Sequence, residues 1–191
     1  MNSALVIDCE TQFSFQEVGH DTAKLKISLV GAFNYRKQEY RSYREADLPQ
    51  LFRQMEHASM IIGFNIRKFD LPVLAPYYLG DMGQFQVVDL LELVENSLGY
   101  RLSLADLALA TLGKGKSGHG FLAIEYFRKG QWEKLEKYCL NDVAITKNLY
   151  EFALKNQKLH YKKFNGKVID IPVNLCGSSD NAGTVSLSLP F

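Results

Sequence analysis

Cysteine is scarce in this chain of 191 residues, and long apolar runs are missing. Its three cysteines, Cys9, Cys139 and Cys176, are too few and too odd in number for a disulfide framework. No His/Cys cluster has the spacing of a zinc site. No apolar run approaches the ~20 residues that a membrane-spanning helix needs, and Asp8 interrupts the first apolar run too early for a signal peptide. We therefore expect a reducing, cytoplasmic setting and no membrane association.

An excess of charge of either sign is also lacking. The 22 Lys and Arg residues nearly balance the 21 Asp and Glu residues, which leaves a net charge of +1. This balance excludes a strongly basic nucleic-acid coat and an acidic disordered tail. It does not exclude a nuclease, because catalytic carboxylates and substrate-binding lysines cancel in the sum. The length fits one domain that can bury a core without disulfides or structural metals.

Strand and helix signals alternate along most of the chain. The predicted strands are 4–7, 59–64 and 85–88, with a hairpin formed by 26–35 and 38–43. The predicted helices begin near Asp47 and Asp70 and cover 90–98, 103–112 and 132–152. A hairpin followed by strands with helices between them predicts an α/β domain with a mixed sheet.

The C-terminal part of the chain changes character twice. Asn165-Gly166 is a strong tight-turn signal and predicts a second hairpin at 159–173. From Cys176 the composition turns to Ser, Gly and Asn, which predicts a mobile tail over 176–191. We expect one domain over 1–175, with the hairpin as a C-terminal extension.

Asp8 and Glu10 follow an apolar run at the end of the first predicted strand. Residues two apart on a strand share a face, so both carboxylates point the same way. Two like charges this close are unfavourable unless something neutralises them, and a divalent cation with oxygen ligands does so. The alternative is a strand that ends in two solvated acids, and a D-x-E pattern alone does not separate these readings.

Two further acids have the same ambiguity. Asp70 follows a strand and a turn, where it fits either a metal ligand or a helix cap, and Asn65 before it fits a turn. Tyr138 and Asp142 lie four residues apart on one face of a predicted helix, close to its apolar stripe. A partly buried Asp needs a partner, which a metal would supply, although a tyrosine at the core edge beside a surface acid fits as well.

In combination these residues resemble the DEDD superfamily of 3′-5′ exonucleases, which share the RNase H-like fold. The matching segments are VIDCET at 6–11, IIGFNIRKFDLPVL at 61–74 and YCLNDVAIT at 138–146, and SLADLALATLG at 103–113 resembles the helix between the second and third motifs. Tyr-x-x-x-Asp in the third motif is typical of the tyrosine (DEDDy) subgroup, whereas the histidine subgroup would carry His where Lys137 stands.

The chain looks most similar to bacterial predicted 3′-5′ exonucleases related to the proofreading domains of family-B DNA polymerases. This resemblance implies an RNase H-like three-layer α/β fold, with a central mixed five-stranded sheet flanked by helices. It also implies hydrolysis of phosphodiester bonds from the 3′ end of nucleic acid, with release of nucleoside 5′-monophosphates.

The resemblance further implies catalysis with two Mg²⁺ or Mn²⁺ ions, which stabilise the attacking and leaving oxygens. Asp8 is the expected bridging ligand, Glu10 and Asp142 complete the shell of the first ion, and Asp70 holds the second ion, directly or through water. Tyr138 is expected to orient the nucleophilic water, because the pKa of an ordinary tyrosine, ~10, favours positioning over proton abstraction.

Substrate contacts are expected directly after the first motif. By resemblance, Thr11, Gln12 and Phe13 contact the terminal nucleotide. The hydroxyl of Thr11 can bond a sugar hydroxyl, and the ring of Phe13 can stack on a base. Core packing explains Phe13 almost equally well. Asn65 and Phe69 are weaker candidates for lining the same groove.

Lysines offer further candidates for phosphate contacts. Lys114 and Lys116 lie in a glycine-rich loop at 112–120 that fits either phosphate binding or a mobile surface loop. A second lysine-rich stretch contains no acid among its lysines, and it fits either a phosphate-binding edge or a solvated face. Its members are Lys155, Lys158, Lys162, Lys163 and Lys167.

The expected substrates are single-stranded DNA or RNA 3′ ends, and any polymerase or helicase partner would be a separate protein. Two alternatives remain open. One is a catalytically silent RNase H-like module for nucleic-acid binding or assembly. The other is an RNase H-type endonuclease, against which the Tyr-x-x-x-Asp pattern argues.

Overall fold

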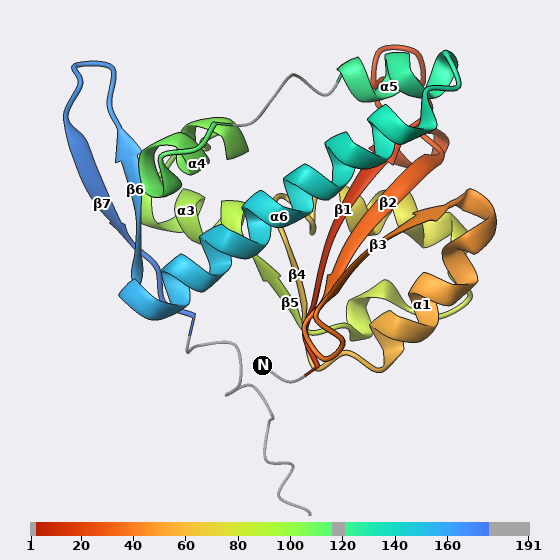
Figure 1. Ribbon diagram of the computed structural model, residues 1–191, viewed down its shortest axis with the longest axis horizontal. Helices are drawn as coiled ribbons and strands as arrows, with labels where there is room; N and C mark the ends of the chain where they lie inside the picture. The colour runs from red at the N-terminus through yellow and green to blue at the C-terminus, as the bar shows by residue number, and fades with distance from the viewer. Residues whose placement is uncertain (1–2, 116–120, 176–191) are drawn as a thin grey trace, which may run out of the picture.

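A mixed sheet of five strands forms the centre of the computed structural model, which describes residues 3–115 and 121–175. The spatial order is β3-β2-β1-β4-β5, in which β1 pairs antiparallel with β2 and parallel with β4 (Figure 1). The strands are β1 (Leu5–Thr11), β2 (Ile27–Asn34), β3 (Glu39–Arg44), β4 (Ile61–Gly63) and β5 (Val87–Asp89). The predicted mixed sheet is therefore confirmed.

Helices cover both faces of this sheet. One core lies between the sheet and helices α3, α4 and α6, and a second lies between the sheet and α1 and α2. The helices are α1 (Leu48–Glu56), α2 (Asp70–Leu74), α3 (Leu90–Leu98), α4 (Leu104–Leu112), α5 (Phe121–Arg128) and α6 (Trp132–Asn156). This three-layer arrangement is the RNase H-like α/β architecture that the motifs predicted. Within the described residues, no helix is long and apolar enough to cross a membrane.

Side-chain caps begin α3 and α4, whereas α1, α2 and α6 begin without one. Asp89 accepts the backbone N–H of Leu91 at 3.0 Å and so caps α3. Asp47 stands at the N-cap of α1, but its carboxylate accepts from Arg44 N and Gln50 Nε2 and makes no cap hydrogen bond. Helix α5 was not predicted, because its eight residues give too short an apolar pattern.

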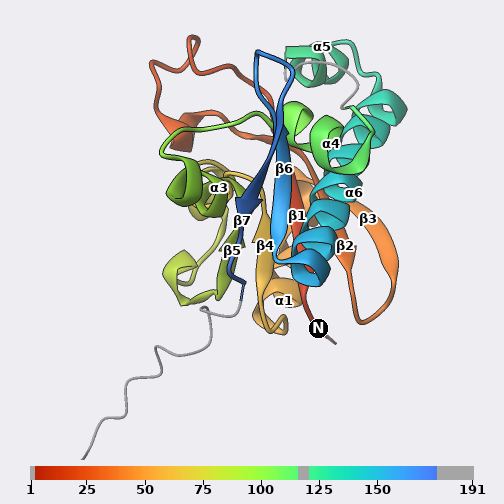
Figure 2. The same cartoon turned by 90° about the vertical axis from the view of Figure 1, so that its left-hand side faces the viewer.

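A second, two-stranded sheet follows α6. It pairs β6 (Lys158–Lys162) antiparallel with β7 (Val168–Pro172), and Gly166 in the turn has a φ of 82°. The predicted hairpin at 159–173 is thereby confirmed within one or two residues. Figure 2 shows it standing beside α3 and α4. The predicted tail over 176–191 lies outside the described residues.

Candidate functional site

Strand β1 carries two carboxylates on the face that α6 covers. Val6, Asp8 and Glu10 alternate with Leu5, Ile7 and Cys9, which pack into the core on the opposite face. The strand extends beyond the predicted apolar run as far as Thr11, so both acids lie within its pairing with β2. Asp8 is partly buried and Glu10 is buried, which holds their side chains in a defined direction.

Helix α6 brings a tyrosine and a third acid to the same face. Tyr138 and Asp142 are both buried, and Asp142 is only 2 % exposed. The close approach depends on Gly31, the partner of Asp8 in β2. A Cβ at Gly31 would meet the Cys139 Sγ and a Val143 methyl at 2.9 Å, so a larger residue would push the helix away from the strand.

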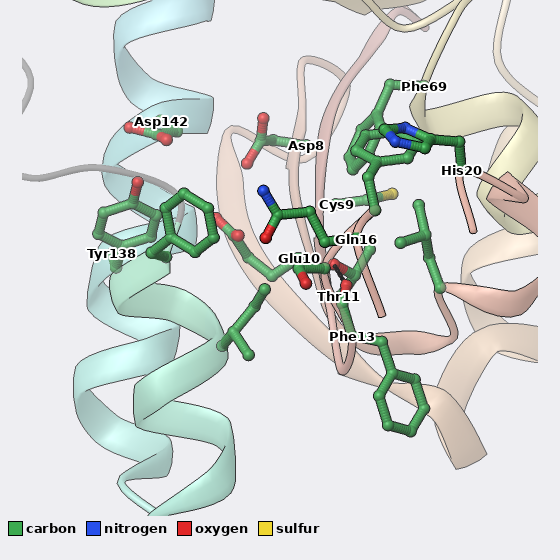
Figure 3. Close-up of a pocket in the computed structure, with 15 residues that line it drawn as sticks. Asp8, Cys9, Glu10, Thr11, Phe13, Gln16, His20, Phe69, Tyr138 and Asp142 are labelled. Atoms are coloured by element: carbon green, nitrogen blue, oxygen red, sulfur yellow. Dashed lines mark hydrogen bonds between the residues drawn. The ribbon is translucent and has the colours of Figure 1, made fainter. Parts of the chain in front are cut away.

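The side chains of Asp8, Glu10, Tyr138 and Asp142 line one cavity of about 550 Å³. Figure 3 shows Tyr138 and Asp142 projecting from α6 on one side, with Asp8 and Glu10 opposite them on β1. One ligand atom each of Asp8, Glu10 and Cys139 lies within 4.8 Å of the others. Burial raises the pKa of the Cys139 thiol, and the negative charges of the three nearby carboxylates raise it further. Asp8, Glu10 and Asp142 therefore face one cavity.

This donor set fits a hard divalent cation. Carboxylate oxygens are the ligands that Mg²⁺ and Mn²⁺ prefer, and the cavity holds three carboxylates where like charges repel. The neighbouring Cys139 is fully buried, and its Sγ lies 3.4 Å from the Asp8 carbonyl oxygen. Asp8, Glu10 and Asp142 are thus the residues of this cavity that can hold a metal ion.

Asp70 lies close to this cavity but does not line it. Its Oδ1 accepts the backbone N–H of Cys9 at 2.8 Å, at a point where β1 continues beyond its pairing with the shorter β4. Burial raises the pKa of this carboxyl to about 7, against the lowering effect of hydrogen bonds from Cys9. Phe69 is the N-cap residue of α2, so the helix-cap reading of Asp70 is wrong. The carboxylate instead reaches β1 between Asp8 and Glu10.

The turn before Asp70 is held by another acid. Asp89 accepts the backbone N–H groups of Asn65 at 2.8 Å and Arg67 at 3.1 Å, in addition to capping α3. Asn65 has a φ of 65°, and its side-chain oxygen accepts from Arg101 at 2.6 Å. The turn reading of Asn65 therefore agrees with the structure, and Asn65 does not line the cavity.

The predicted substrate contacts divide into two groups. Thr11, Phe13 and Phe69 line the cavity. The Thr11 hydroxyl donates to the Phe13 carbonyl at 2.9 Å, and Figure 3 shows the Phe13 ring directed away from the carboxylates. A register shift between Glu10 and Thr11 interrupts the alternation of β1. Beyond it, the Gln12 amide donates to the Ile27 carbonyl, outside the cavity lining.

Only one of the two loop lysines lies within the described residues. Lys114 is exposed just after α4 and does not line the cavity, and Lys116 lies outside the described residues.

Several cavity residues escaped the sequence analysis. Gln16 lies in the segment after β1, and Figure 3 shows its amide between Asp8 and Glu10. His20 has a φ of 64° and stacks on Phe15 with ring centroids 5.9 Å apart. In the same segment Glu17 forms a 2.5 Å ion pair with Arg128 of α5. An aromatic-rich stretch after a D-x-E strand end was the available signal, but spacing alone does not reveal which way a loop folds.

Comparisons with known proteins agree with this architecture. A family model described as the RNase H superfamily matches residues 6–154. A family B DNA polymerase from the hyperthermophilic archaeon Pyrobaculum calidifontis has a similar structure, with a TM-score of 0.61 and 16% sequence identity over 79% of this chain. The match spans only 24% of the polymerase chain, and its low identity supports the fold alone. No curated protein sequence matches this chain significantly.

Proposed function

The chain belongs to the RNase H superfamily, and from this premise we propose that it is a metal-dependent 3′-5′ exonuclease of the tyrosine (DEDDy) type. One observation carries the proposal. Asp8, Glu10, Tyr138 and Asp142 come from segments far apart in the sequence, yet they line one cavity. The proposed domain comprises residues 1–175, with 176–191 as a tail.

The proposed ligands are Asp8 for both ions, Glu10 and Asp142 for the first ion, and Asp70, directly or through water, for the second. Bound Mg²⁺ or Mn²⁺ would supply Lewis-acid stabilisation of the attacking and leaving oxygens. The assignment of Asp70 is supported by its position behind β1, where its carboxylate bonds the N–H between the two acids of that strand. The proposed relation to bacterial exonucleases and to polymerase proofreading domains rests on the three motifs.

The remaining cavity residues would position the substrate and the nucleophile. We assign the Tyr138 hydroxyl to orienting the attacking water beside the carboxylates, since it shares the cavity with them. Phe15 and Phe69, whose ring centroids are 5.8 Å apart, form an apolar wall against which a terminal base can stack. The Thr11 hydroxyl can turn from the Phe13 carbonyl to a sugar hydroxyl.

The test uses oligonucleotides labelled at the 3′ or the 5′ end, incubated with Mg²⁺ or Mn²⁺ or with a chelator. We expect stepwise shortening from the 3′ end that requires the metal and is lost in Asp142→Asn. Glu133→Gln is the matched control, because Glu133 is an exposed acid in the first turn of the same helix.

The other outcomes separate the alternatives. Metal-dependent internal cuts would support an RNase H-type endonuclease instead. Binding without cleavage under every metal condition would support a catalytically silent module. Equal loss of activity in Asp142→Asn and Glu133→Gln would contradict the assignment of the site.

A further inference from the structure

The β6–β7 hairpin is anchored firmly at its base and projects its turn into solvent. Leu159 and Ile171 face each other across the two strands, and both are completely buried in the core beneath α4 and α6. The Thr111 hydroxyl of α4 bonds both the backbone N–H and the carbonyl of His160, at 2.9 and 3.1 Å. The hairpin is therefore held in a fixed direction relative to the sheet.

The structure sorts the lysines of this region into two groups. Lys158, at the base, forms an ion pair with Asp170 at 2.6 Å. Lys162, Lys163 and Lys167, around the turn, are exposed and form no ion pair with any acid among residues 3–115 and 121–175. No acid of the described residues neutralises their charges.

A single aromatic ring stands among these charges. Phe164 is fully exposed, at 108% of its reference area, although a phenylalanine usually buries most of its ring. Lysines that surround an exposed ring match a single nucleic-acid strand, because the ammonium groups pair with phosphates and the ring stacks on a base.

The turn lies at the same end of the sheet as the candidate active site. Figures 1 and 2 both show it at the end where α5 and the loop after β1 lie, and Figure 1 shows it on the opposite flank from α5. Asp142 lies 14 residues before Asn156, the last residue of α6, which corresponds to about 21 Å of helix before the hairpin begins. The turn stands at the far end of the hairpin from this base, so a strand that advances about 3.4 Å per nucleotide must extend several nucleotides from the cavity to reach it.

We propose that the hairpin tip, Lys162, Lys163, Phe164 and Lys167, is a second nucleic-acid contact that holds the strand several nucleotides upstream of the 3′ end in the cavity. This inference rests on the proposed exonuclease function. It assigns a role to these lysines, whose positive charges offset the acids of the cavity in the chain's net charge of +1.

Binding without cleavage tests the proposal independently of catalysis. Fluorescence anisotropy of a labelled single strand of about 20 nucleotides is measured in Ca²⁺ over a salt series. For Lys162→Ala/Lys163→Ala, we expect the slope of log affinity against log salt to fall by about 1.4, or about 0.7 per lost charge. The control is Arg36→Ala/Lys37→Ala, which removes the same charge from the turn between β2 and β3, beside the start of β1. Its slope should remain that of the wild type.

Phe164→Ala tests the stacking contribution. Its affinity for the long strand should fall about fivefold or more, with an unchanged salt slope, because an aromatic platform acts on bases and not on phosphates. The loss in both hairpin variants should grow with oligonucleotide length and vanish for a dinucleotide, which is too short to reach from the cavity to the tip.

Three outcomes would overturn the proposal: wild-type binding by both hairpin variants, an equal loss in the Arg36/Lys37 control, or a loss that is independent of strand length. Wild-type binding by the variants together with 3′-5′ cleavage by the wild type would remove the hairpin proposal and leave the exonuclease function standing. Length-dependent loss of binding in the variants, together with no cleavage by the wild type, would support the hairpin contact and contradict the exonuclease function.

Discussion

The acidic cavity and the hairpin tip are two regions of opposite charge, and they are built in opposite ways. The cavity gathers Asp8, Glu10 and Asp142 from β1 and α6, and two of these three acids are buried. The tip gathers exposed lysines from one short turn. A buried charge is tolerated only where the packing is exact and a partner neutralises it, whereas an exposed charge needs neither. Substitutions should therefore affect both packing and function at the cavity, and only binding at the tip.

The largest expected effect comes from removing one carboxylate at the cavity. Asp8→Asn should lower the rate of 3′-end release by on the order of 10³-fold, because the proposed bridging ligand is lost. The metal-free melting temperature should stay the same or rise, since a repulsive charge is removed. End-labelled degradation and a thermal melt in chelator measure the two quantities. A variant that melts far below the wild type would show that Asp8 is needed mainly for folding.

Tyr138→Phe should have the next largest effect. It keeps the ring in its buried position and removes only the hydroxyl, so a rate decrease of about 10- to 100-fold is expected if this group orients the attacking water. Mn²⁺ affinity, measured by titration calorimetry, should remain unchanged. A matching loss of Mn²⁺ affinity would assign Tyr138 to metal binding instead.

Gly31→Ala addresses the packing that brings the two halves of the cavity together. The added methyl would lie 2.9 Å from Cys139 Sγ and from a Val143 methyl, so we expect destabilisation of about 1–3 kcal/mol and reduced activity. Urea denaturation measures the first effect. The matched control is Gly115→Ala, where nothing lies within 4 Å of the added carbon. Equal stability of the two variants would contradict the role assigned to Gly31.

Asp70 should make stability depend on pH in the metal-free protein. Its pKa is raised to about 7, whereas an unfolded Asp titrates near ~3.9. Between these values the native state binds more protons than the unfolded state, so the free energy of unfolding falls as pH rises. Asp70→Asn keeps an oxygen to accept from Cys9 and loses the charge, so its advantage over the wild type should grow from about pH 5 to about pH 8. A constant difference in denaturation midpoint between these pH values would contradict burial as the cause.

The smallest expected effect is on folding at the hairpin tip. Lys162→Ala/Lys163→Ala should change the free energy of unfolding by no more than about 0.5 kcal/mol, because both side chains are exposed and form no ion pair within the described residues. Urea denaturation beside the wild type measures it. A larger change would show that the tip, like the cavity, depends on packing.

Much of the architecture could be predicted from local patterns. Alternation placed Asp8 and Glu10 on one face, and the four-residue spacing placed Tyr138 and Asp142 on one side of a helix. Asn165-Gly166 located the second hairpin. These features depend on neighbours in the chain, and short-range geometry determines them. Helix α5 was missed because a single short, mostly apolar segment carries no clear period.

Contacts between distant segments could not be predicted in this way. Only the folded chain shows that Gly31 lets α6 approach β1, that Asp70 bonds Cys9 from behind the strand, and that Gln16 and His20 line the cavity. The bulge after Glu10 likewise turned Gln12 away from its expected place. The sequence alone thus determined the candidate residues for the chemistry and the order of the elements that hold them. The tertiary structure decided which of these residues meet, because their distances depend on packing between elements that no local pattern encodes.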